Sequence, residues 1–109
     1  MKTLLLHAPK DKDAASGLHK AFDSILTNHK GPDYAIYGNL TGQISTGMKV
    51  VVFDRAGHRQ AEGIVAGLNP TGHKTATGVL RYDVLIRGLS EVPYTNPQRV
   101  NRCGIGFAV

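Results

Sequence analysis

The sequence predicts a single α+β domain in which one N-terminal helix packs on a small, curled, mostly antiparallel β-barrel. Helical spacing of apolar residues is confined to residues 11–30, and only short β-prone runs follow it. Thirteen glycines, most of them between those runs, would supply the corners of a partly closed barrel. With 109 residues, of which 41% are hydrophobic, the chain fits one domain spanning residues 1–109.

The N-terminal part predicts a strand followed by the helix. The run Leu4-Leu5-Leu6 is apolar on both faces and meets Pro9, which predicts a short buried strand in the middle of a sheet. Residues 11–30 then predict the helix, with acidic residues at its start and Gly31-Pro32 at its end. Its buried face is expected to consist of Leu18, Phe22, Ile25 and Leu26.

The remaining chain predicts strands joined by turns. Residues 34–37 form the first β-prone run, and residues 48–54 predict a strand inside the sheet because Val50-Val51-Val52-Phe53 is apolar on both faces. Residues 55–58 predict a hairpin turn leading to a second strand over 60–68. The polar residues 69–78 predict an exposed loop. Further strands are expected over residues 79–87, 89–94 and 105–109.

Charge directs attention to polyanionic partners. The formal net charge is +5, of which residues 48–109 contribute +4, mostly through arginine. The single cysteine, Cys103, cannot form an intramolecular disulfide, which indicates a reducing compartment or indifference to the redox state, and we expect a cytoplasmic protein. No apolar run is long enough to span a membrane, so no membrane association is expected.

The order of the strand segments resembles the EVE branch of the PUA-like barrels. The matching segments are ISTGMKVVVF at 44–53, AEGIVAGL at 61–68, RYDVLI at 81–86 and EVPY at 91–94, preceded by an apolar strand and a helix. Gly47-Met48 stands where that family has Gly-Asp. The resemblance implies a PUA-like β-barrel that binds RNA or DNA and, in several relatives, holds a modified base in a pocket.

Base capture requires an aromatic ring for stacking, an amide for the base edge and cations for the flanking phosphates. Tyr34, Tyr37 and Asn39 provide the first two within six residues, and we expect them to line a cleft whose rim includes Arg55, His58 and Lys74. We therefore predict a non-catalytic module for RNA or single-stranded DNA, without a cofactor. The predicted nucleic-acid-binding residues are Tyr34, Tyr37, Asn39, Arg55, His58, Arg59, Lys74, Arg81, Arg99 and Arg102.

Other functions remain open at this point. The five histidines lack the spacing of a metal site, so no metal is expected. His58 and Arg59 could meet His73 and Lys74 at one barrel end and cleave RNA by acid–base catalysis. Gly72-His73-Lys74 also resembles the Gly-x-Lys motif of the ASCH branch, some members of which hydrolyse nucleosides, but in a different order along the chain. A small-molecule-binding barrel and a structural or adaptor protein are the alternatives outside nucleic-acid binding.

Overall fold

The computed structural model describes residues 2–8, 20–55, 57–96, 100–101 and 104–108. Most of these residues belong to one six-stranded sheet with the order β2-β5-β4-β3-β1-β6. Its strands are β1 (Thr3–His7), β2 (Lys30–Ala35), β3 (Lys49–Asp54), β4 (Arg59–Lys74), β5 (Leu80–Val92) and β6 (Ile105–Ala108). Two helices are described, α1 (Lys20–Asn28) and the single turn α2 (Gly38–Thr41), and neither is long and apolar enough to cross a membrane.

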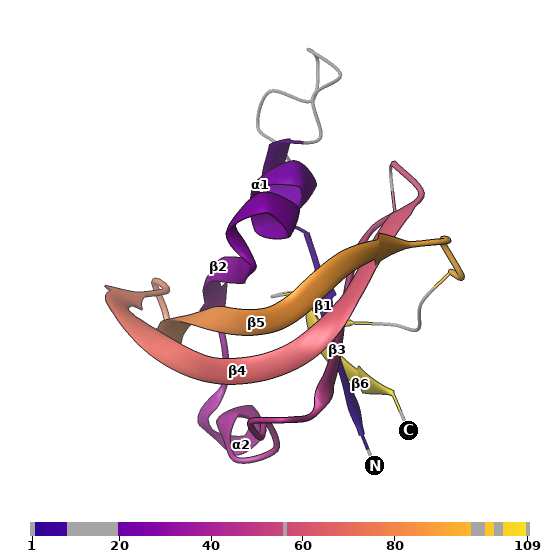
Figure 1. The fold of residues 1–109 in the computed structure, drawn as a ribbon. Helices are drawn as coiled ribbons and strands as arrows, with labels where there is room; N and C mark the ends of the chain where they lie inside the picture. The colour runs from indigo at the N-terminus through magenta and orange to yellow at the C-terminus, as the bar shows by residue number, and fades with distance from the viewer. Residues whose placement is uncertain (1, 9–19, 56, 97–99, 102–103, 109) are drawn as a thin grey trace.

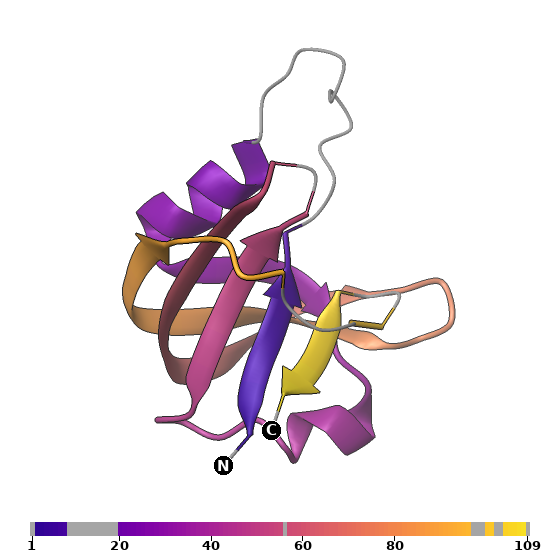
Figure 2. The same cartoon turned by 90° about the vertical axis from the view of Figure 1, so that its right-hand side faces the viewer.

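The sheet curls into a half-barrel. β4 and β5 form a long antiparallel ribbon with register shifts at three places, and this ribbon sweeps across the molecule beneath α1 (Figure 1). β3, β1 and β6 continue the sheet side by side, as Figure 2 shows. Every neighbouring pair is antiparallel except β1 and β3, so the predicted mostly antiparallel sheet is confirmed. β2 and β6 are its two edges.

The apolar runs of the sequence occupy the centre of this sheet. β1 lies between β3 and β6, and β3 lies between β4 and β1, as predicted for strands that are apolar on both faces. Leu4, Leu6, Val50 and Val52 face the large core inside the half-barrel. On the opposite face, a smaller core formed by Leu5, Val51 and Phe53 is covered by Tyr94, Val100 and Ala108.

Helix α1 closes the hollow of the half-barrel with the predicted apolar face. Phe22 and Ile25 are buried in the large core and Leu26 packs against it, whereas residues 11–19, including Leu18, lie outside the described residues. The helix ends earlier than predicted. His29 adopts a left-handed φ of 55° while its N–H donates to the Ile25 carbonyl at 2.9 Å. Residue 30 therefore already belongs to β2, where the sequence had predicted the last helical turn.

The β4–β5 ribbon is longer than predicted. Much of the expected loop over residues 69–78 is strand, because β4 continues to Lys74 in register with β5. The polar composition of residues 69–78 did not indicate this strand. The far end of β4 pairs with β5 alone, so it requires main-chain hydrogen bonds but no apolar side chains, and it can include Pro70. The predicted strands 79–87 and 89–94 merge into β5. β2 ends at Ala35, within the β-prone run predicted over residues 34–37. The chain then enters α2, which the sequence did not predict.

Candidate nucleic-acid interface

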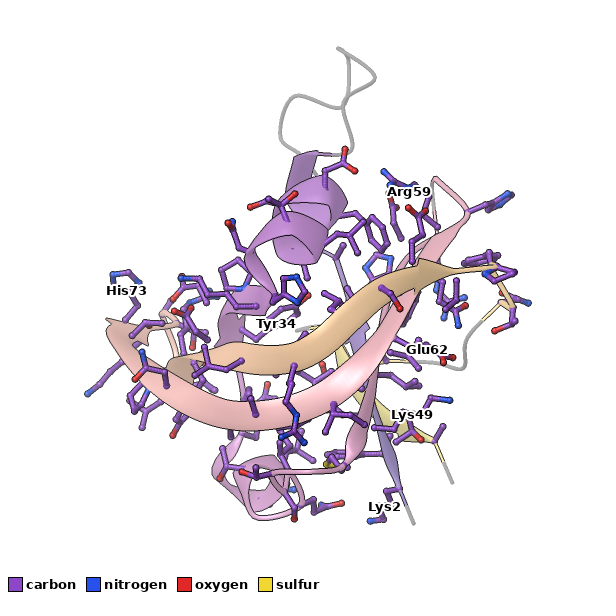
Figure 3. The ribbon with its side chains drawn as sticks, viewed as in Figure 1. Lys2, Tyr34, Lys49, Arg59, Glu62 and His73 are labelled. Carbon is purple, nitrogen blue, oxygen red and sulfur yellow. The ribbon has the colours of Figure 1, made fainter. Side chains whose placement is uncertain are left out.

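The predicted site residues fall at two separate ends of the sheet. Arg55, His58 and Arg59 lie at the β3–β4 hairpin, and Lys74 lies at the opposite end of β4, a strand of 16 residues. Figure 3 shows the separation through Arg59 and His73, which project from opposite ends of the β4–β5 ribbon. The predicted rim of Arg55, His58 and Lys74 is therefore wrong. The acid–base arrangement that joined His58 and Arg59 to His73 and Lys74 is wrong for the same reason.

Tyr34 belongs to the core. Only 4% of its surface is exposed, and its hydroxyl donates a hydrogen bond to the carbonyl of His7 at 2.8 Å. Burial raises the pKa of this phenol, because the phenolate would lie in an apolar environment. The prediction that Tyr34 lines a cleft is wrong, because its ring has no face on which a base could stack.

Tyr37 and Lys74 are brought to the same end of the sheet. The Ile36 N–H donates to the Leu80 carbonyl at 3.1 Å, and Leu80 is in register with Lys74 across the β4–β5 ribbon. Tyr37 and Leu80 are two of the large apolar side chains that remain exposed, at 47% and 46%. Asn39 follows Tyr37 in α2 and is also exposed. This end of the sheet thus combines an aromatic ring, an amide and a cation.

Most described cations are committed to partners within the protein. Lys30 and Lys49 lie within ion-pair distance of Asp83 and Glu62, and Lys2 donates to the Gln43 side chain. Among the Lys and Arg side chains that the structure describes, Lys74 and Arg87 have no hydrogen bond or ion pair. Both belong to the β4–β5 ribbon, and the sequence reasoning had not selected Arg87.

β5 presents part of this positive charge on the outer face of the ribbon. Val84 and Ile86 are buried whereas Leu85 and Arg87 are exposed, as expected for a strand with one face toward the core. Arg81 shares the outer parity of Leu85 and Arg87, and its Nη1 donates to the Asp33 carbonyl at 2.9 Å. The outer face therefore carries Arg81, Asp83, Leu85 and Arg87 in line.

A polar network ties three strands together next to Lys74. His73 Nδ1 and Thr71 Oγ1, both in β4, lie 3.0 and 2.9 Å from Asp33 Oδ1 in β2. The backbone N–H of Asp33 donates to Asp83 Oδ1 in β5 at 2.9 Å. Sequence reasoning missed Asp33 and Thr71, because only the strand register brings residues about forty positions apart into contact. Their Gly-Pro-Asp and Asn-Pro-Thr-Gly settings look like ordinary turns.

Asp33 is held in its ionised form. Partial burial by itself raises the pKa of this carboxyl group. Hydrogen bonds from His73 and Thr71, together with the positive charge of Arg81 and that of His73 when its imidazole is protonated, outweigh that effect and bring the pKa below its ordinary value. The network therefore contains a carboxylate that accepts hydrogen bonds from two side chains at a single oxygen.

Arg59 has a structural role at the other end of the sheet. Its guanidinium lies 2.6 Å from Asp23 of α1, donates two hydrogen bonds of 2.9 and 3.0 Å to Glu91 of β5, and stacks over the Phe22 ring at 4.7 Å. The hydrogen bonds with Glu91 and Asp23 raise its pKa further. Two carboxylates compensate its charge, so the structure gives no support to the prediction that Arg59 contacts phosphate.

Two other residues of the predicted site lie at the β3–β4 hairpin. His58 is exposed and stacks on Tyr94 with a centroid distance of 5.2 Å, and the Arg55 guanidinium lies 5.0 Å from the centre of the Phe53 ring. Arg99 and Arg102 lie outside the described residues. Within the described part of the chain, no three His, Cys, Asp or Glu side chains come together in a way that could hold a metal ion.

Described residues also line two open hollows on the surface. One, of about 420 Å³, is lined by Lys2, Gln43 and residues 45–48, and the other, of about 360 Å³, lies over Leu5 and Val51. A small-molecule-binding barrel would be expected to show a pocket lined by Tyr and Ile, and neither hollow has such a lining. Comparisons with protein-family models, curated proteins and solved structures found no match to this chain.

Proposed function

We propose that this chain is a nucleic-acid-binding module that contacts single-stranded RNA or DNA through the β4–β5 end of its sheet. One observation carries the proposal. Lys74 and Arg87 have no partner among the described residues, and both lie on the β4–β5 ribbon. The exposed ring of Tyr37 lies beside the end of the ribbon that carries Lys74. Lys74, Arg81 and Arg87 would contact phosphates, Tyr37 would stack on a base and Asn39 would hydrogen-bond its edge.

Two further features of the chain support this proposal. A half-barrel with a helix in its hollow agrees in outline with the PUA-like architecture that the strand segments resemble, and we propose that the domain is of this type, EVE branch included. In that case Tyr37 and Asn39 are the residues for a modified base, since Tyr34 is buried. The single cysteine supports a reducing compartment, and we propose the cytoplasm as the site of action.

Fluorescence anisotropy with short labelled oligonucleotides tests the proposal. Single-stranded RNA, single-stranded DNA and a duplex would be titrated at several salt concentrations, beginning at low salt. Two to three phosphate contacts to a single strand predict a slope of log K against log salt of roughly −1.4 to −2.1. Absence of association with all three nucleic acids at low salt would refute the proposal.

Matched variants locate the interface. Lys74→Gln and Arg87→Gln should each weaken binding and reduce the salt slope by about 0.7. Lys49→Gln removes an exposed lysine that already pairs with Glu62 at 3.3 Å, and it should leave the slope unchanged. Tyr37→Ala should weaken binding by about 1–3 kcal/mol, whereas Tyr37→Phe keeps the ring and the affinity. Equal binding by Tyr37→Ala and wild type would place the interface elsewhere.

A further inference from the structure

Asp33 is held by several hydrogen bonds in a backbone conformation that few non-glycine residues adopt. Its φ is 58°, in the left-handed region, at a register shift between β2 and β5. Its N–H donates to Asp83, its carbonyl accepts from Arg81, and its Oδ1 accepts from Thr71 and lies 3.0 Å from His73 Nδ1. Four contacts from β4 and β5 therefore fix Asp33, two of them at its backbone and two at the carboxylate that faces the imidazole, and such over-determined residues are typical of functional sites.

The orientation of His73 follows from this contact. An ionised carboxylate can only accept hydrogen bonds, so Nδ1 of His73 carries the proton that points at Asp33. In the neutral imidazole the lone pair is then on Nε2, as in an Asp–His pair poised for proton transfer. The side chain is 69% exposed, and Nε2 has no polar partner among the described residues. His73 therefore presents a basic nitrogen to solvent next to Lys74.

We infer that His73 acts as a general base in the cleavage of bound RNA, in which the ribose 2′-hydroxyl attacks the adjacent phosphate. The inference rests on the proposed nucleic-acid binding. Nε2 takes the 2′-hydroxyl proton, the 2′-oxygen forms a bond to phosphorus and the bond from phosphorus to the 5′-oxygen breaks. The 5′-oxygen takes a proton from water, and His73 returns its own proton to solvent. The products are a 2′,3′-cyclic phosphate and a free 5′-hydroxyl, and no co-reactant is consumed. This departs from the non-catalytic module predicted from the sequence.

Asp33 also positions a cation for this reaction. Its carbonyl holds Nη1 of Arg81 at 2.9 Å, while the other guanidinium N–H groups have no partner in the part of the chain that the structure describes. These groups can stabilise the negative charge that develops on the phosphate oxygens. Asp33 is thus a positioning residue for both the base and the cation, and His73 is the residue that touches the substrate.

The experiment uses an end-labelled DNA oligonucleotide that contains one ribonucleotide, with the chain of residues 1–109 and no added metal. Wild type should cut at that ribonucleotide and leave a 2′,3′-cyclic phosphate, which mass spectrometry identifies. The all-DNA oligonucleotide, which lacks the nucleophile, should remain intact. His73→Gln should lower the cleavage rate about 10²- to 10⁴-fold, the usual contribution of a general base. His58→Gln, purified in the same way, removes an exposed histidine from the other end of the sheet and should keep the rate.

Asp33→Asn tests the positioning role. The asparagine amide can donate to Nδ1 and favour the tautomer with its proton on Nε2, so the cleavage rate should fall while oligonucleotide binding persists. If Asp33→Asn does not fold, His73→Gln, which changes an exposed side chain, still decides the question.

The outcomes separate the two proposals. Binding without cleavage, or equal cleavage by wild type and His73→Gln, overturns the catalytic inference and leaves the binding function standing. Absence of binding in the anisotropy assay overturns both. Cleavage that depends on His73 and on the 2′-hydroxyl, but not on His58, supports the inference.

Discussion

Gly63→Ala should destabilise the protein because the curl of the β4–β5 ribbon leaves no room for a side chain at this position. A Cβ on Gly63 would lie 2.7 Å from Ile86 Cγ2, 3.0 Å from the Arg87 carbonyl oxygen and 3.2 Å from Leu89 Cα. The Ile86 methyl can move, but the other two atoms belong to the backbone of β5. Overpacking of this kind costs about 1–3 kcal/mol.

Gly67→Ala is the matched control in the same strand. Its Cβ would meet only Leu85 Cδ1, at 3.9 Å, and neither glycine has a φ in the left-handed region. Alanine there should stabilise the protein by about 0.4–1 kcal/mol, because it restricts the unfolded chain. The two variants should therefore differ by roughly 1.5–4 kcal/mol, with Gly63→Ala melting roughly 5–20 °C below wild type by circular dichroism. Equal melting temperatures would show that β4 and β5 do not approach each other so closely at Gly63.

Three further predictions concern the attachment of α1. Phe22→Ala removes a ring that is 1% exposed and should lower the free energy of unfolding by roughly 3–5 kcal/mol in urea titrations; an unchanged midpoint would contradict the packing of α1. Arg59→Met should cost roughly 0.5–1 kcal/mol, since its pairs with Asp23 and Glu91 are partly exposed, and Arg87→Met, which breaks no pair, is the control. Hydrogen bonds from Arg59 hold the pKa of Glu91 in the folded protein below its ordinary value of 4.5. The Arg59–Glu91 pair therefore contributes fully to stability above pH 4.5, and this contribution is lost as the pH falls through the lower pKa of the folded protein. Stability should consequently fall as the pH is lowered below 4.5, and less so in Arg59→Met; the same fall in both proteins would show that Glu91 does not cause it.

The strands that carry apolar runs could be predicted from the sequence because burial alone determines them. Leu4-Leu5-Leu6 and Val50-Val51-Val52-Phe53 each need cover on two faces, and only central strands provide it. The hairpin between β3 and β4 followed from its turn residues. The far half of β4 was missed because Asn69, Pro70 and Lys74 contribute main-chain pairing and almost no hydrophobic burial.

The candidate site depends on strand register, to which local sequence patterns are insensitive. Tyr34 and Tyr37 look equivalent in the sequence, but β2 places the first ring in the core and ends before the second. Asp33 meets His73 only because β2 and β4 both pair with β5 at the same level, near Arg81. A histidine and an aspartate forty residues apart give no local signal of such a contact.

The cations predicted to form one rim lie at opposite ends of β4, and this separation affects where a polyanion could bind. In a closed small barrel the loops at one end would meet, and Arg55, Arg59 and Lys74 would form one positive rim. In this half-barrel β4 extends over sixteen residues, and its two ends lie in different electrostatic environments. At the hairpin end, Asp23 and Glu91 neutralise Arg59 and use its charge to attach α1. At the other end, no described residue compensates the charge of Lys74, and for this reason we expect the salt dependence of the proposed binding to follow Lys74 and to be insensitive to Arg59.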